Sequence, residues 1–303
     1  MQLSSPTAAT PKHRRFLTRR TIVPWLFILP VLTLHLAVVA GPAVSAFYYS
    51  LTEWNGLGPA RFIGLENFAH ILADRQYATA LGNNLRWMVF FMTVPFALAL
   101  VSAAALAPVK RGAMFLRTAL FLPYVLPSVV IANIWRYLLA PDAGIPAALR
   151  GLGLPGFDVA LLGQSSTALW CAAFVDNWHF WGFLMVLFLT AMQGVPSELY
   201  EAVRLDGATR AQEFWYVTIP GIMPTLVFML VITASWSVLT FDYIWLLTQG
   251  GPAGSSEVLS TLVFDSFNHF EAGYAAALGL SMSLLALLIL SMFAVLRRRG
   301  WEL

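Results

Sequence analysis

The chain has 303 residues, of which 59% are hydrophobic and only 11% are charged. A soluble domain carries roughly 25% charged residues, so this composition excludes an ordinary soluble protein and indicates a membrane protein. The net charge is only +3, and Cys171 is the only cysteine, which excludes a disulfide framework within the chain.

The N-terminal segment, residues 1–21, is a polar and basic tail that contains Lys12, Arg14, Arg15, Arg19 and Arg20. We expect this tail to be cytoplasmic. A cleaved signal peptide is the alternative, but the apolar run that follows is too long for the hydrophobic region of a signal peptide.

Six apolar runs are long enough to cross a bilayer, which takes about 20 residues per helix. They are residues 22–48, 85–107, 113–140, 167–192, 221–247 and 274–296. We therefore predict an all-α membrane protein with six transmembrane helices. The transmembrane domain occupies residues 22–299, and residues 300–303 form a short cytoplasmic C-terminus.

The distribution of basic residues predicts the orientation of these spans. If the N-terminus is cytoplasmic, thirteen of the 18 Lys and Arg residues lie inside. Besides the five in the tail, these are Lys110, Arg111, Arg117, Arg204, Arg210 and residues 297–299. Cytoplasmic segments are enriched in Lys and Arg, so we expect both termini to be cytoplasmic.

The three segments expected outside the membrane differ in character. Residues 62–72, FIGLENFAHIL, predict a short amphipathic helix on the outer interface. Residues 141–166 are rich in Gly and Pro, and we expect them to be irregular. The third outer segment begins with residues 246–258, LLTQGGPAGSSEV.

Polar and aromatic side chains recur at helical spacing within three of the spans. They are Tyr124 and Ser128 in the third span, Asp176, His179, Phe180 and Phe183 in the fourth, and Thr233, Trp236, Ser237 and Thr240 in the fifth. Such spacing places them on one face of each helix, and lipid offers no partner for the polar groups. We therefore expect them to line a cavity, with a kink at Pro127. The alternative is that they bond to neighbouring helices or to their own backbone carbonyls.

Residues 194–220 are the polar segment between the fourth and fifth spans. We expect Ser197 to cap a short helix over residues 198–206, with Glu201 and Arg204 paired at i, i+3. Gly207 should stop that helix, because Gly adopts the left-handed conformation without penalty.

A second short helix is predicted after Gly207. Thr209 and Gln212 have the spacing of a capping box, and Pro220 is expected to end this helix and lead into the fifth span. The segment would then form a rigid polar element on the membrane surface.

The sequence excludes nucleotide hydrolysis by this chain. A P-loop needs Gly-Lys-Ser/Thr to hold phosphates, and the only lysines, Lys12 and Lys110, follow Pro and Val. No His/Cys pattern of a metal site and no plausible catalytic triad is present. We therefore predict that the chain is not an enzyme and binds no cofactor or metal.

The segment 201–220 resembles the EAA loop of ABC-importer permeases, through Glu201-Ala202, Gly207 and Pro220. Val203, Val217 and Ile219 replace the second Ala, the Ile and the Leu of that motif. The wider stretch PSELYEAVRLDGA resembles the carbohydrate-uptake branch, the maltose and glycerol-phosphate permeases. GLENF in residues 64–68 and LTQGGP in residues 247–252 resemble further segments of that branch.

This resemblance implies a type I ABC-importer permease fold in a prokaryotic cell membrane. Its implied partners are a second, non-identical permease, an extracytoplasmic solute-binding protein and two ATPase subunits that hold the ATP and Mg; nucleic acid is not a partner. The resemblance assigns ATPase coupling to Glu201, Ala202, Asp206, Gly207 and Pro220, and it places the polar faces along the solute pathway.

The solute is left open at this point. Aromatic rings beside hydroxyls suit sugars, oligosaccharides or other polyols, and the branch includes glycerol-3-phosphate permeases. Asp176 near Trp236 would also suit a cation, including the choline head group of a glycerophosphodiester. Asp242, near the outer end of the fifth span, is interpreted as structural, paired with Arg136.

Two other classes of protein remain as alternatives. An ion-coupled secondary transporter would need an intramembrane ion site, for which Asp176 is the candidate, but no internal repeat is evident. A membrane-embedded enzyme is less favoured because no two catalytic groups recur at workable spacing.

Overall fold

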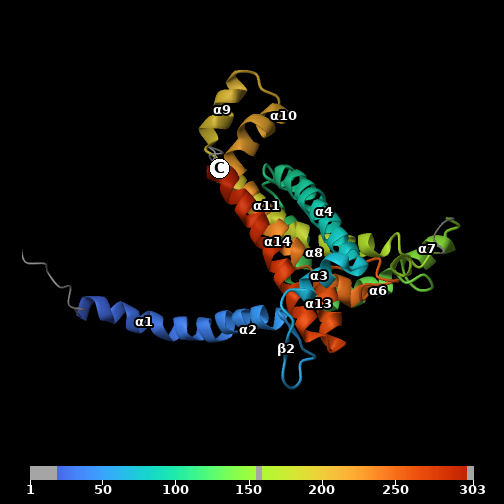
Figure 1. Ribbon diagram of the computed structural model, residues 1–303. Coiled ribbons are helices and arrows are strands. Elements are labelled where there is room, and N and C mark those ends of the chain that lie inside the picture. Colours follow the sequence, from blue (N-terminus) through green and yellow to red (C-terminus); the bar gives the residue numbers. More distant parts are fainter. Residues whose placement is uncertain (1–18, 155–158, 299–303) are drawn as a thin grey trace, which may run out of the picture. The chain divides into compact units, whose positions relative to one another are not determined.

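The computed structural model describes residues 19–154 and 159–298 (Figure 1). The chain divides into two compact units, Met1–Tyr48 and Tyr49–Leu303. The first contains α1 (Arg19–His35), a π-helical turn, η1 (Leu36–Ala40), and most of α2 (Gly41–Ser50).

The second unit is almost wholly helical. Its elements are β1 (Thr52–Glu53), β2 (Arg61–Phe62), α3 (Glu66–Ala73), α4 (Arg75–Leu106), α5 (Ala113–Val125), α6 (Ser128–Leu138), α7 (Ile145–Gly151), η2 (Leu161–Gly163), α8 (Ala168–Gln193), α9 (Ser197–Leu205), α10 (Arg210–Glu213), η3 (Phe214–Thr218), α11 (Ile219–Val238), α12 (Asp242–Leu247), α13 (Leu259–Asn268) and α14 (Ala272–Arg298). The two strands pair antiparallel, with Thr52 opposite Phe62 and Glu53 opposite Arg61.

The prediction of six spans is confirmed. Within residues 19–154 and 159–298, five helices are long and apolar enough to cross a membrane, and a sixth span is obtained when the bent pair α5–α6 is counted as one. The fourth and sixth predicted spans agree with α8 and α14 to within a few residues. The second span begins earlier than predicted, because Asp74 caps α4 by accepting from the backbone N–H of Gln76 at 2.8 Å.

The third span is not one kinked helix. α5 and α6 meet at an angle of 97°, with Pro127 as the residue before α6. The break falls at the predicted place, but it is much sharper than a proline kink. The residues on its two sides, Tyr124 and Ser128, therefore belong to different helices.

The predicted fifth span, 221–247, is wrong at both ends. The helical run begins at Arg210 and continues through η3 into α11, which ends at Val238. Residues 239–241 are not helical, and α12 follows as a separate helix.

The outer segments are more ordered than predicted. The helix expected over residues 62–72 is α3, preceded by β2. Asn67 on α3 is buried and donates to the carbonyls of Ser50 and Thr52, both at 2.9 Å. The segment 141–166, predicted to be irregular, contains α7 and η2.

Two apolar clusters form the core of the second unit. One joins α4, α8 and α11 around buried side chains such as Trp87, Leu184 and Phe188; the other joins α13 to α14. α5 packs so closely on α8 that a Cβ at Gly182 would lie 2.0 Å from the carbonyl oxygen of Leu120. A side chain at position 182 would thus force the two helices apart.

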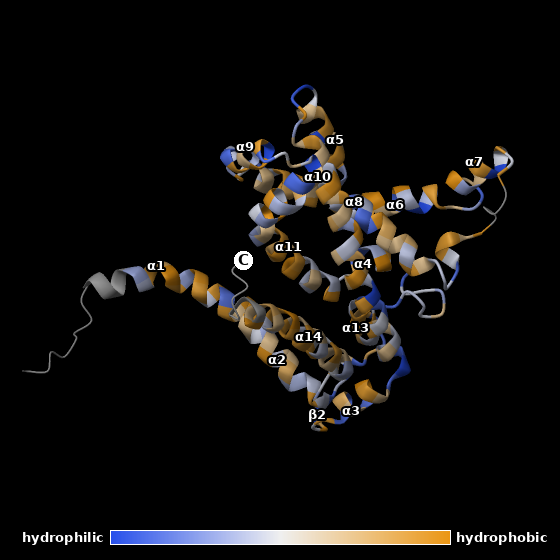
Figure 2. Cartoon of the chain, turned by 90° about the horizontal axis from the view of Figure 1, so that it is seen from above, coloured by the Kyte–Doolittle hydropathy of each residue, from blue (hydrophilic) through white to orange (hydrophobic). Residues whose placement is uncertain are grey.

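α9 and α10 lie at one end of this bundle, and α3, α6 and α13 lie toward the other (Figure 1). Hydrophilic residues gather in α9 and α10, whereas α11 and α14 are mainly hydrophobic along their length (Figure 2). Large apolar side chains such as Phe228, Leu287 and Leu288 are exposed on the long helices, as expected of surfaces that face lipid or a partner helix.

Candidate functional site

A cavity of about 330 Å³ lies between α4, α5, α6, α8, α11 and α12. Its walls combine aromatic rings with a few polar groups, which is the usual composition of a small-molecule site. The lining residues are Trp87, Phe91, Tyr124, Ser128, Asp176, His179, Phe180, Thr233, Trp236, Ser237, Leu239, Thr240, Phe241, Asp242 and Tyr243.

Nine of the ten residues predicted to line a cavity do so. The tenth, Phe183, lies beside it and stacks on Tyr124 with ring centroids 4.4 Å apart. Thr240 reaches the cavity from the break between α11 and α12 rather than from a helix face.

Asp176 and His179 occupy one wall of the cavity. His179 Nδ1 lies 3.9 Å from Asp176 Oδ1, and His179 Nε2 lies 3.3 Å from the carbonyl oxygen of Tyr124. The imidazole also stacks near the ring of Tyr124, with centroids 5.3 Å apart. The histidine is therefore held between α8 and α5.

The hydroxyl groups that α11 and α12 contribute to the cavity differ in their partners. The Ser237 hydroxyl donates to the carbonyl of Thr233 in the same helix at 2.8 Å. This agrees with the alternative interpretation, in which such side chains bond to their own backbone carbonyls. Thr233 Oγ1 and the Tyr243 hydroxyl are buried and have no hydrogen-bond partner among the residues that the structure describes. Buried polar groups are normally paired, so these two hydroxyls stand out as unsatisfied polar groups of residues that line the cavity.

The sequence reasoning missed several residues of this cavity. Trp87 and Phe91 have i, i+4 spacing in α4, a signal that was available. Phe241 and Tyr243 could not have been placed without knowing the break after α11. Asp242 also lines the cavity, and its predicted partner Arg136 donates to the carbonyl of Leu246 instead.

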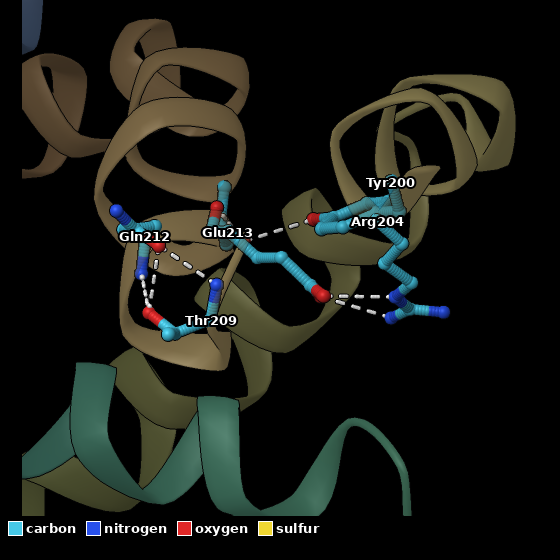
Figure 3. A network of polar contacts seen from close by, with 6 residues as sticks. Tyr200, Arg204, Thr209, Gln212 and Glu213 are labelled. Carbon is cyan, nitrogen blue, oxygen red and sulfur yellow. Dashed lines mark hydrogen bonds and ion pairs between the residues drawn. The ribbon is translucent and has the colours of Figure 1, made fainter. Parts of the chain in front are cut away.

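The segment 194–220 forms a second candidate site (Figure 3). Gly207 ends α9 as predicted, with φ of +81°, and Ala208 N–H closes the turn by donating to the carbonyl of Val203 at 3.0 Å. The predicted cap Ser197 is wrong: α9 follows Pro196, and Ser197 is its first residue. Pro196, whose ring fixes its own φ, therefore occupies the capping position, and no side chain of the described residues caps this helix.

The capping box at the start of α10 is confirmed. The backbone N–H of Gln212 donates to Thr209 Oγ1 at 3.3 Å, and the backbone N–H of Thr209 donates to Gln212 Oε1 at 2.8 Å (Figure 3). These reciprocal bonds fix where the long helical run into the bundle begins.

The predicted pairing of Arg204 with Glu201 is wrong. Arg204 forms two hydrogen bonds to Glu213, Nε to Oε1 at 2.8 Å and Nη2 to Oε2 at 2.9 Å (Figure 3). This carboxylate raises the pKa of Arg204 above its ordinary value. Tyr200 adds a bond between its hydroxyl and Thr218 Oγ1 at 3.0 Å. α9 is thereby fastened to α10 and η3.

The prediction that Pro220 ends a helix is wrong. It lies within the first two residues of α11, directly after the π-helical turn, where Ile219 N–H donates to the carbonyl of Phe214. A proline clashes with the carbonyl four residues before it, and the wider π-turn relieves that clash. η1 stands in the same relation to Pro42.

One side of α9 and of the following turn is exposed. It includes Glu201, Ala202, Asp206 and Gly207. Leu205 is 89% exposed. On the inner side, a cavity of about 800 Å³ lies between α9, α10 and the ends of α4 and α8. The bonds Arg204–Glu213 and Tyr200–Thr218, here called the latch, thus hold α9 to α10 and η3, while the other side of α9 is exposed.

Comparisons with known proteins agree with this architecture. The family model "Binding-protein-dependent transport system inner membrane component" matches residues 95–301. "Probable ABC transporter permease protein YurN" of Bacillus subtilis is 35% identical over 262 residues, which are 85% of this chain and 89% of that protein. "Diacetylchitobiose uptake system permease protein NgcF" of Streptomyces coelicolor is 32% identical over 302 residues, covering 95% of this chain and 86% of that protein.

Solved structures show the same fold. A chain of a bacterial ABC transporter involved in the import of the acidic polysaccharide alginate superposes with a TM-score of 0.84 at 24% identity, covering 94% of this chain and 98% of that chain. The predicted fold, a type I importer permease, is confirmed, as is the resemblance to permeases of the carbohydrate-uptake branch.

Proposed function

The chain belongs to the family of binding-protein-dependent transport system inner membrane components, and on that premise we propose that it is one permease subunit of an ATP-driven importer of sugars or oligosaccharides. One observation carries this proposal. A single helical run, residues 210–238, begins at the latch on α9 and ends at the cavity. Movement of the polar segment is thereby passed to the walls of a site of solute size.

In this proposal the exposed side of α9 is the surface that ATPase subunits grip from the cytoplasm. Glu201, Ala202 and Asp206 supply contacts, and Gly207 gives the turn its shape. The role of Pro220 is to hold the π-helical turn where α11 begins. Closure of the ATPase subunits on nucleotide would then move α9, and the latch would carry α10 and α11 with it.

The cavity is proposed as this subunit's part of the solute pathway. It takes contributions from Tyr124, Ser128, Asp176, His179, Phe180, Thr233, Trp236, Ser237 and Thr240, with Phe183 as the ring that supports Tyr124. Aromatic faces beside hydroxyl and carboxylate groups suit a polyhydroxylated solute. Glycerol 3-phosphate, also in the class predicted from the sequence, is less suited because two aspartates line the cavity.

The assembly proposed around this chain has four further proteins. A second, non-identical permease completes the pathway, two ATPase subunits hold ATP and Mg, and an extracytoplasmic solute-binding protein delivers the solute. The chain itself is proposed to bind no cofactor. Membership of the family disfavours the ion-coupled secondary transporter.

Affinity purification of the tagged chain from its native membrane tests this proposal. We expect a second permease and an ATPase to co-purify, with ATPase activity that rises when the solute-binding protein and its sugar are added. A chain that purifies alone and transports in liposomes without ATP would overturn the proposal in favour of secondary transport.

A further inference from the structure

The charge of the cavity between α8, α11 and α12 restricts which solutes it can hold. Asp176 and Asp242 contribute two carboxylates, and none of the described lining residues is Lys or Arg. The only base among them is His179. Carboxyl groups therefore outnumber basic groups by two to one among the lining residues, which favours a negative field in the cavity. Low-dielectric walls concentrate that field within the cavity.

The Asp176 carboxylate keeps capacity to accept a ligand. The imidazole of His179 is 3.9 Å from its nearest oxygen, which is longer than a hydrogen bond. On the facing helices, Thr233 is 2% exposed and Tyr243 is 4% exposed, and their hydroxyls have no partner within the described part of the chain. All three groups line the same cavity.

The aromatic lining adds a second attraction for positive charge. Trp236 is 48% exposed and lies edge to face against Phe180, with centroids 6.0 Å apart. Tyr124 and Phe241 contribute further rings. The faces of such rings attract cations, most strongly for Trp. A carboxylate next to aromatic faces is the arrangement that binds an organic cation rather than a phosphate or a carboxylate.

A bare metal ion does not match this site. Over residues 19–154 and 159–298 there is no group of three or more His, Cys, Asp or Glu side chains that could hold one. The aromatic walls suit instead a cation that carries its own apolar or polyol surface.

We propose that this cavity selects solutes with a positively charged nitrogen, such as an amino-substituted sugar or polyol, with Asp176 as the counter-ion, Trp236 as the aromatic contact, and Thr233 and Tyr243 as hydroxyl contacts. This rests on the proposed function, since it specifies the solute class of the same pathway. Asp242 contributes to the field without direct contact.

The test measures the cavity's charge preference without needing to know the solute. The full chain, in the complex it forms and with Cys171→Ala as background, receives one reporter thiol at Ser128→Cys inside the cavity. The control reporter is Ser165→Cys, on an exposed turn that does not line the cavity. Modification by trimethylammonioethyl and by sulfonatoethyl methanethiosulfonate is followed by mass spectrometry.

We expect the ratio of cationic to anionic modification rates to be about tenfold higher at Ser128→Cys than at Ser165→Cys, a factor worth about 1.4 kcal/mol. Asp176→Asn should remove most of this preference, and Asp176→Glu should keep it. Asp242→Asn, on a separate helix, should lower it as well. If Asp176→Asn fails to assemble, Asp242→Asn still reports the field.

Protection of the thiol tests the binding contacts. Choline should slow the modification of Ser128→Cys, whereas its neutral isostere 3,3-dimethylbutanol at the same concentration should not. Trp236→Leu should weaken the protection by choline, and it should lower the cationic preference of the reagents less than Asp176→Asn does. Equal rate ratios at the two reporters, or equal protection by the two isosteres, would overturn the inference.

These readouts need neither ATP nor transport. A cavity without charge preference in a complex that retains its ATPase would therefore reject this inference alone. A charge-selective cavity in a chain that binds no ATPase would reject the proposed function and leave the selectivity standing.

Discussion

At the scale of single residues, Gly207 shows a position where backbone conformation decides the residue type. Its φ is +81°, and a Cβ placed there would meet nothing within 4 Å. Crowding is therefore no obstacle to a side chain at this position. The requirement comes from the left-handed conformation alone, which costs an L-residue roughly 1–2 kcal/mol.

Gly207→Ala should loosen the end of α9 for this reason. We expect hydrogen exchange at the amides of Gly207 and Ala208, measured in the purified complex, to quicken by about fivefold for each kcal/mol of strain. Gly82→Ala is the matched control, since Gly82 lies in α4 with open space around it. It should leave the exchange of the turn unchanged; an equal effect of both variants would contradict the argument.

Glu257 is a second residue whose surroundings set its behaviour. It is 7% exposed, in the segment between α12 and α13. The backbone of Gly250 approaches it so closely that a Cβ there would lie 2.5 Å from Oε2. Burial raises the pKa of Glu257 above its ordinary value of 4.5, because the apolar surroundings disfavour the charged carboxylate.

The raised pKa predicts how stability depends on pH. The protonated carboxyl stabilises the fold fully below pH 4.5, and this contribution is lost as pH rises through the higher folded-state pKa. Glu257→Gln mimics the protonated form, so its thermal midpoint should exceed that of the wild type more at pH 8 than at pH 5. Exposed Glu271→Gln serves as the control for net charge. A difference that shrinks as pH rises would contradict the assignment.

At the scale of elements, α9 is joined to α10 and η3 by bonds between polar side chains. The side chain of Arg204 is 61% exposed, whereas the side chain of Glu213 is 11% exposed. The ion pair therefore sits at an edge, with its acid turned inward. Two parallel hydrogen bonds from a guanidinium fix orientation as well as distance, so this pair suits a latch that transmits movement.

Breaking the latch should separate ATP hydrolysis from transport. We expect Arg204→Ala and Glu213→Ala each to lower the number of solute molecules transported per ATP in proteoliposomes, with the complex still assembled. Exchange of the two charges, Arg204→Glu with Glu213→Arg, should restore part of this ratio, because the pair can form again. If the exchanged pair performs no better than either single variant, the ion pair is not the transmitting contact.

Some of these elements could be predicted from the sequence alone, and others could not. Apolar runs predicted α8 and α14 nearly to their ends, because lipid imposes a length on each span. The predictions at Pro127 and Pro220 were wrong in opposite ways: the break at Pro127 was underestimated, and the break at Pro220 was not found. Pro127 precedes a 97° break that no proline rule predicts, and Pro220 was accommodated by a π-helical turn that depends on packing around it.

The candidate sites were predictable to the extent that they followed local periodicity. The faces around Asp176 and Trp236 were found from helical spacing, and so was the capping box at Thr209. The partner of Arg204 could not be found in this way, because Glu213 approaches it only after the chain reverses at Gly207. The same holds for Tyr243, which reaches the cavity from the separate helix α12.

At the scale of the whole molecule, the central claim is that the polar segment at one end of the bundle controls the cavity through one continuous helical run. α11 packs against α4, α8 and α14, so a shift of its first turn is constrained by three neighbours. Closely packed protein cores move between discrete arrangements rather than deforming smoothly. We therefore expect movement of α9 to change the cavity as a unit.

Coupling in the reconstituted complex tests this claim most directly. The wild-type complex and Glu201→Ala are placed in liposomes with the solute-binding protein, and ATP hydrolysis and uptake are measured together for the sugar whose import is lost when the chain is deleted. Gln164→Ala, an exposed change far from the segment in sequence, is the control. We predict that Glu201→Ala assembles and hydrolyses ATP but imports little, while the control matches the wild type. Full ATP-driven uptake by Glu201→Ala, or uptake by the wild type without ATP, would contradict the account.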